Sequence, residues 1–181
     1  NSHVKIERYD NYWGVKGKIK TLIVRKIPNT DTRYAALKSG EIDGVTDLNA
    51  IPPFLAEELK KDSNFVVYKN KSTMVRYLAL NGTKFHFNDV RMRQAVSLAI
   101  DRQDLVNALY MGYAIPTVNI LNYCSPGYKE FPVRHDLQEA KRLAHAALGD
   151  KRVEIVYGIN GAEPLQKGAA GTIAYSLTDI G

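Results

Sequence analysis

The chain has 181 residues, of which 45% are hydrophobic and 24% are charged, a composition typical of a globular protein with one or two modest cores. Its longest apolar runs, such as Leu22-Ile23-Val24, are far shorter than the roughly 20 residues of a membrane-spanning helix, and the first residues lack a charged-then-apolar signal peptide. The 25 basic and 19 acidic residues give a net charge of +6, but bases and acids alternate and no nucleic-acid-binding motif accompanies them, so a nucleic-acid partner is not expected.

The residue types that carry metal or nucleophilic chemistry are few and scattered. The single cysteine, Cys124, has no neighbouring base to activate it, so we expect an inert or partly buried thiol. The chain has four histidines, and their spacing is not that of zinc ligands. They are His3, His86, His135 and His145. No nucleophile elbow, phosphate loop or dinucleotide fingerprint occurs, and we expect neither a cofactor nor enzymatic activity.

The chain begins with two segments that favour β-strands. Val4–Tyr9 alternates apolar and charged residues and is predicted to be an edge strand. Lys18–Ile27 is rich in β-branched residues and predicts a strand with a buried middle. Between them, Tyr12 and Trp13 are expected to anchor a loop against the core.

A short helix follows, which either Asn29 or Thr30 caps and Gly40 closes. Glu41–Val45 is predicted to be a brief strand, and a strand-helix-strand unit favours parallel pairing with a right-handed crossover. Ligands tend to lie beyond the carboxyl ends of such strands, so residues 46–49 form the first loop expected near a cleft. An ordinary surface turn is the alternative.

The next elements are a short amphipathic helix over Pro53–Lys61 and two strands, Phe65–Lys69 and Met74–Asn81. The second strand alternates less cleanly, as expected for a strand that is covered on both faces. The helical side chains expected to face inward are Phe54, Leu55 and Leu59.

Two capped helices are predicted to meet in a tight elbow at Ile100-Asp101. Asn88 caps the first helix. Asp101 caps the second, which has Asp104 at its third position and Gly112 at its left-handed end. The first helix places a buried stripe on one face: Met92, Ala95, Val96 and Ala99.

Ala114–Tyr128 is rich in proline, asparagine and tyrosine and is predicted to be a loop. Asp136 and Glu139 then form a capping box, and Gly149 ends the helix that they begin. The apolar face of this helix comprises Leu137, Ala140, Ala144, Ala147 and Leu148.

The last predicted elements are a strand over Arg152–Tyr157 and a helix within Pro164–Ile180. Gly168 and Gly171 weaken the helical pattern, because glycine disfavours helix interiors.

Several segments spread over almost the whole chain share the characteristic sequence pattern of one protein family. They are Asn11–Gly14, Ile27-Pro28, Thr32-Arg33, Ala36–Asp43, Tyr77–Asn81, Phe87–Val106, Ser125–Gly127 and Asp136–Lys141. In this order they resemble family 5 of the solute-binding proteins of ABC importers, the periplasmic or lipoprotein receptors for oligopeptides, dipeptides and nickel chelates.

The resemblance implies an α/β fold of the periplasmic binding protein type 2 kind, with a mixed sheet and flanking helices. It implies that the chain is a middle fragment of two lobes. Residues 1–80 would be the second segment of the sheet lobe that also receives the termini, and residues 81–181 the start of the other lobe. The expected protein is a monomer that meets a membrane permease, in the periplasm or as an anchored extracellular lipoprotein.

The resemblance also gives candidate ligand-binding residues. Tyr77 stands where oligopeptide-binding members place an aromatic ring against the ligand. Ala79 stands where some peptide binders carry a carboxylate, and this departure implies that the ligand's charged end is not fixed there. Together with Met74 on the same predicted strand and with Asp47 and Asn49 in the first loop, Tyr77 completes the candidate set.

The favoured function is capture of an oligopeptide or dipeptide for import, without catalysis. The alternatives are a nickel-chelate or haem receptor of the same family, or the solute-sensing domain of a cytoplasmic transcription regulator. An enzyme of unrecognised type and a structural domain without a ligand are the remaining alternatives.

Overall fold

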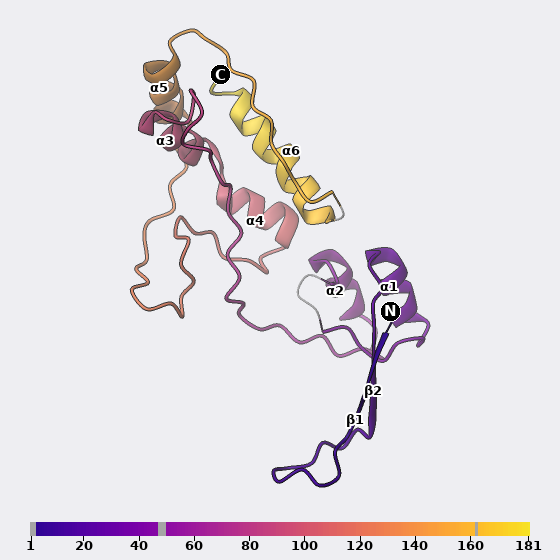
Figure 1. Ribbon diagram of the computed structural model, residues 1–181. Helices are drawn as coiled ribbons and strands as arrows, with labels where there is room; N and C mark the ends of the chain where they lie inside the picture. The colour runs from indigo at the N-terminus through magenta and orange to yellow at the C-terminus, as the bar shows by residue number, and fades with distance from the viewer. Residues whose placement is uncertain (1–2, 47–49, 162) are drawn as a thin grey trace. The chain divides into compact units, whose positions relative to one another are not determined.

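The computed structural model describes residues 3–46, 50–161 and 163–181 (Figure 1). The chain divides into two units, residues 1–51 and 52–181. Two strands and six helices lie within the described residues. None of the helices found there is long and apolar enough to cross a membrane.

The first unit contains a hairpin of two antiparallel strands, β1 (His3–Glu7) and β2 (Thr21–Arg25). Both predicted strands are therefore present, although each is shorter than predicted. The register places Val4 opposite Val24 and Ile6 opposite Leu22, so these four apolar side chains share one face. All four are about half exposed, so the predicted buried middle of the second strand is wrong. Among the described residues, β1 is the one strand that lies beside β2.

The aromatic pair between the strands does not anchor the loop to a core, contrary to prediction. Trp13 is 91% exposed and Tyr12 is also exposed. Their ring centroids are 5.2 Å apart, so the two rings pack against each other. The loop runs out beyond the far end of the hairpin (Figure 1), and the residues described as buried in the first unit, Ala36 and Ala50, lie outside it.

The helix α1 (Thr30–Lys38) begins at Asn29, whose side-chain oxygen accepts from the amide of Thr32 at 2.9 Å. This contact selects Asn29 over Thr30 as the cap. Gly40 has a φ of +75°, as its predicted closing position requires. The strand predicted over residues 41–45 is absent, because the amides of Glu41 and Ile42 donate back to the carbonyl of Ala36 and are not available for a ladder.

The second unit begins with α2 (Pro53–Leu59). Leu59 and Ala56 are buried as one stripe, whereas Phe54 is exposed, so its predicted inward position is wrong. The reason is the helical period: Pro53, Ala56 and Leu59 recur every third residue, and Phe54 falls beside that stripe.

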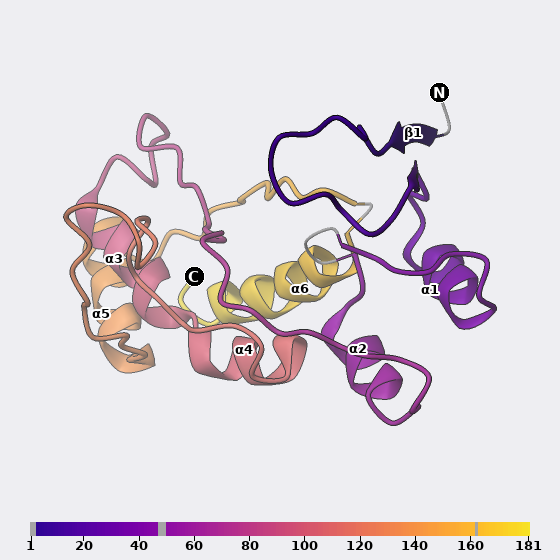
Figure 2. The same cartoon turned by 90° about the horizontal axis from the view of Figure 1, so that it is seen from below.

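The core of the second unit lies between pairs of helices. The helix α3 (Val90–Ala99) packs along α5 (Leu137–Leu148), and α4 (Arg102–Tyr110) lies along α6 (Pro164–Thr178), as both views show (Figures 1 and 2). The predicted stripe on α3 is confirmed as buried. The other buried members of this core are Phe87, Ile100, Ala140, Ala144, Leu148, Ile173 and Ile180.

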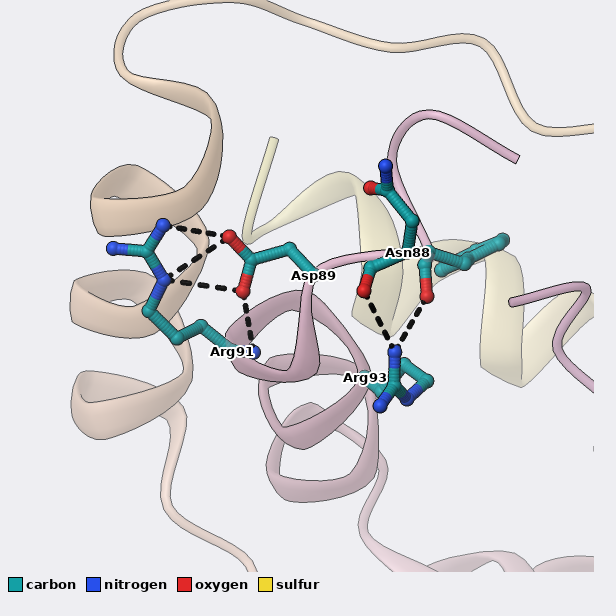
Figure 3. Close-up of polar contacts among 5 residues, drawn as sticks. Asn88, Asp89, Arg91 and Arg93 are labelled. Atoms are coloured by element: carbon teal, nitrogen blue, oxygen red, sulfur yellow. Dashed lines mark hydrogen bonds and ion pairs between the residues drawn. The ribbon is translucent and has the colours of Figure 1, made fainter. Parts of the chain in front are cut away.

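The first turn of α3 is held by one aspartate–arginine ion pair and by a second arginine that binds backbone carbonyls (Figure 3). Asp89 caps the helix by accepting from the amide of Arg91 at 2.8 Å, so the prediction of Asn88 was one residue early. The Asp89 carboxylate also accepts from the Arg91 guanidinium, and Arg93 donates to the carbonyls of Phe87 and Asn88. Asn88 therefore contributes its backbone carbonyl to the start of α3, as an acceptor for Arg93, and its side chain is not the cap.

The elbow between α3 and α4 has the predicted form. Asp101 accepts from the amide of Asp104 at 3.0 Å, and Ile100 is extended between the helices. Arg102 folds back and donates to the carbonyl of Ser97 at 2.7 Å and to its hydroxyl at 3.0 Å. Burial lowers the pKa of Arg102, since the charged form loses solvation.

The predicted cap of α5 is confirmed, because Asp136 accepts from the Glu139 amide at 3.0 Å. The reciprocal half of the predicted capping box is wrong: the Asp136 amide donates to the carbonyl of Leu98, and the Glu139 carboxylate accepts from Arg142. The strands predicted over 65–69, 74–81 and 152–157 are not formed in the structure. A strand needs a hydrogen-bonded neighbour, and none lies beside these three segments in the part of the chain that the structure describes. Their side chains still pack: Leu78, Leu80, Val153 and Ile155 lie against the core.

Candidate functional site

The candidate residues that the structure describes lie on the extended segment 74–81. Tyr77 is 68% exposed and Met74 is also exposed, while Leu78 and Leu80 pack against the core. Asp47 and Asn49, the other two candidates, lie outside the described residues. The structure therefore does not bring the four candidates together in one described site.

An ion pair next to Tyr77 was missed by sequence reasoning. The Arg76 guanidinium donates to Glu163 through two bonds, of 2.5 Å and 3.1 Å. These residues are 87 positions apart in the chain, so no local pattern could connect them. Arg76 lowers the pKa of Glu163, and the nearby side chain of Gln166 donates a further hydrogen bond to that carboxylate.

The charges of this pair act on half-buried Tyr110, at the end of α4. Burial raises the pKa of its hydroxyl, and the Glu163 charge acts in the same direction while that of Arg76 opposes it. The ion pair thus joins the extended segment to the start of α6 beside the end of α4.

A second polar cluster surrounds Tyr113, which follows α4. Its hydroxyl donates to Glu57, and the ammonium of Lys60 lies within hydrogen-bonding distance of both groups. Lys69 lies over the Tyr113 ring at 4.3 Å from the centroid. The bonds from Lys60 and Tyr113 lower the pKa of Glu57, and the bond to Glu57 raises the pKa of Lys60. This cluster ties α2 and the segment after it to the turn that ends α4.

A surface hollow of about 710 Å³ lies over α3, α5 and the loop before α5. Its lining comprises Gln94, Ser97, Leu98, Val118, Pro132, Arg134, Asp136, Glu139, Arg142 and Leu143. The charged groups in it are already paired, Arg142 with Glu139 at 2.7 Å and Arg134 with Asp136 at 3.6 Å. The lining offers polar and apolar contacts but none of the sequence candidates.

Cys124 is exposed, so of the two expectations, an inert or a partly buried thiol, the partly buried one is wrong. Hydrogen bonding with Cys124 raises the pKa of the Tyr123 hydroxyl. Within residues 3–46, 50–161 and 163–181, no three side chains among histidine, cysteine, aspartate and glutamate converge as a metal site would require.

Comparison with known sequences gives a match along the whole chain. The sequence model of one protein family, the bacterial extracellular solute-binding proteins, family 5 Middle, matches residues 1–181. The dipeptide-binding protein of Escherichia coli (strain K12) is 28% identical over 149 residues, which are 81% of this chain and 27% of that protein. Heme-binding protein A of Haemophilus influenzae is 28% identical over 139 residues, 75% of this chain and 24% of that protein.

Solved structures show the same fold. The periplasmic binding protein DppA of Helicobacter pylori, in complex with the peptide STSA, is 29% identical with a TM-score of 0.77 over 99% of this chain and 35% of its own. NikA of Brucella suis, in complex with Fe(III)-EDTA, has a TM-score of 0.86 at 23% identity over 99% of this chain and 39% of its own, and this likeness is one of fold alone. The chain spans about a quarter of the length of the curated relatives that it matches.

Proposed function

The chain belongs to family 5 of the bacterial extracellular solute-binding proteins, and from this premise we propose that it is part of an ABC importer's substrate-binding protein that captures oligopeptides or dipeptides. Two observations on relatives support peptide capture: the E. coli relative is a dipeptide-binding protein, and H. pylori DppA was solved with a peptide. The protein would hold its solute without altering it and deliver it to a membrane permease.

The single observation in this chain that supports the proposal best is the exposure of Tyr77 on an extended segment. Leu78 and Leu80 pack against the core, so the exposed ring of Tyr77 lies on a segment whose backbone is held in place. An aromatic face and an extended backbone are suited to a peptide, which is recognised through main-chain bonds and loosely specified side-chain contacts. Asp47, Asn49 and Met74 are proposed as further contacts.

We assign residues 1–80 to the sheet lobe and residues 81–181 to the start of the other lobe. The apolar face of the β1–β2 hairpin supports the first assignment, because a two-stranded hairpin is marginal in water and gains stability from packing on more sheet. The family's extracellular character supports a periplasmic or lipoprotein location and a permease partner.

The second candidate function is capture of haem or a nickel chelate. The match to heme-binding protein A, at the same 28% identity as the dipeptide-binding protein, favours it. Both candidates use one cleft and differ in the solute, so a direct binding measurement separates them.

Isothermal titration of the complete native protein against a peptide library, nickel–histidine and haem tests the proposal. Peptide binding is expected, and Tyr77→Ala should weaken it about tenfold, the loss of one buried aromatic contact. Tyr175→Ala is the matched control, since Tyr175 is 75% exposed on α6, and it should leave affinity unchanged. Binding of haem or nickel–histidine without any peptide would select the second candidate.

A further inference from the structure

The segment 74–81 is attached to the rest of the second unit in two different ways. In its later half, Leu78 and Leu80 pack against the helical core. In its earlier half, Arg76 is joined to Glu163, the residue that immediately precedes α6. The packed pair resists displacement of the segment from the core, while the ion pair fixes the segment against the start of a particular helix.

The Arg76–Glu163 contact has the geometry of an oriented pair. Nη2 of Arg76 donates to Oε1 of Glu163 at 2.5 Å, and Nη1 donates to Oε2 at 3.1 Å. Two bonds between the planar guanidinium and the planar carboxylate fix their mutual orientation. The carboxylate is itself held, since Gln166 donates to Oε2 at 2.5 Å and accepts from the amide of Asn160 at 2.8 Å. Both members of the pair are partly shielded, with about a third of the Arg76 side chain and a quarter of the Glu163 side chain exposed.

Residues of an extended chain point alternately to opposite sides. Arg76, Leu78 and Leu80 are spaced by two, and each is engaged with the body of the unit. Tyr77 lies between the first two of them and is left exposed. The three even-numbered contacts therefore decide the direction in which Tyr77 leaves the backbone.

We propose that Arg76 is a positioning residue for solute capture: its forked ion pair with Glu163 holds residues 74–77 so that Tyr77 faces the solute. This inference rests on the proposed function and adds a residue to it that does not itself touch the solute. The charges of the pair also act on the half-buried hydroxyl of Tyr110 at the end of α4.

A thermodynamic cycle in the complete native protein tests this role. The probe is the tightest-binding member of a di- and oligopeptide library, measured by isothermal titration. Arg76→Gln should weaken binding about fivefold, whereas in a Tyr77→Ala background it should add nothing, because the effect acts through Tyr77.

The reversed pair, Arg76→Glu with Glu163→Arg, should restore affinity to within about twofold of the wild type. Arg91→Gln breaks another forked pair, at the start of α3 and not on segment 74–81, and is the control expected to leave affinity unchanged.

Hydrogen–deuterium exchange of residues 74–81 without solute gives an independent readout. Exchange should be faster in Arg76→Gln and return to the wild-type rate in the reversed pair. Unchanged exchange, or equal weakening of binding by Arg76→Gln with and without Tyr77, would overturn the positioning role. Faster exchange in a protein that binds no peptide would instead count against the proposed function, and the ion pair would then be purely structural.

Discussion

Aspartate side chains begin three of the helices of the second unit, and each accepts from an amide in the first turn. These caps are Asp89, Asp101 and Asp136. Two were predicted from sequence, because a capping residue followed by an acidic residue at the third position is a local pattern. At α3 two candidate caps stand side by side, and only the backbone geometry distinguishes Asp89 from Asn88.

The two neighbours give a matched test of that assignment. Asp89→Ala should lower the free energy of unfolding of the complete protein by about 1 kcal/mol, because an amide in the first turn loses its acceptor. Asn88→Ala should cost less than about 0.5 kcal/mol, since Arg93 binds the Asn88 carbonyl, which alanine retains. Chemical denaturation measures both, and the reverse ranking would return the cap to Asn88.

The carboxylate of Glu163 makes stability dependent on pH in a defined direction. Arg76 lowers its pKa in the folded protein below the ordinary value of 4.5. A group with a depressed folded pKa stabilises the fold fully above its unfolded pKa, and this contribution is lost as the pH falls through the folded value. The difference in unfolding free energy between the wild type and Glu163→Gln should therefore be largest above pH 4.5 and shrink in more acidic solution. A difference that stays constant between pH 6 and pH 3 would contradict this; urea denaturation at each pH measures it.

At the scale of elements, the helices could be predicted from sequence and several strands could not. The stripe of α3 and the caps of α4 and α5 depend on residues a few positions apart, so the sequence carries them directly. A strand depends on a neighbour that is distant in sequence, and segment 74–81 keeps the alternating packing of a strand without the ladder. The Arg76–Glu163 pair escaped prediction for the same reason.

The glycines of α6 show how one residue type can have two roles. A Cβ on Gly168 would approach Cδ2 of Leu109 on α4 to 2.8 Å, whereas a Cβ on Gly171 would meet nothing within 4 Å. Gly171→Ala should raise the free energy of unfolding by about 0.5–1 kcal/mol, because alanine is the better helix former. Gly168→Ala has the same gain in helix propensity but must displace Leu109. The free energy of unfolding of this variant should therefore be lower than that of Gly171→Ala. Thermal and chemical denaturation compare the two, and equal stabilisation would show that Leu109 moves aside freely.

At the scale of the whole molecule, the hairpin of the first unit presents two unlike faces. Val4, Ile6, Leu22 and Val24 form the apolar face, and the opposite face carries Ile23 among charged and polar side chains. In a family whose curated members are about three times as long as this chain, we expect the apolar face to pack on further sheet of the same lobe. The hairpin register could be read from alternation, but the layer that covers one of its faces could not.

Val24 and Ile23 test that expectation, because in this structure they are almost equally exposed, at 51% and 56%. They are adjacent and β-branched, so substitution by lysine changes hairpin propensity by a similar amount at each. If further sheet covers the apolar face, Val24→Lys buries an ammonium and should lower the unfolding free energy of the complete protein by about 2–3 kcal/mol, while Ile23→Lys changes it by less than about 1 kcal/mol. Denaturant midpoints of the two variants measure the difference. Effects below about 1 kcal/mol in both variants would mean that both faces of the hairpin meet solvent, and residues 1–80 would then lose their assignment to the sheet lobe.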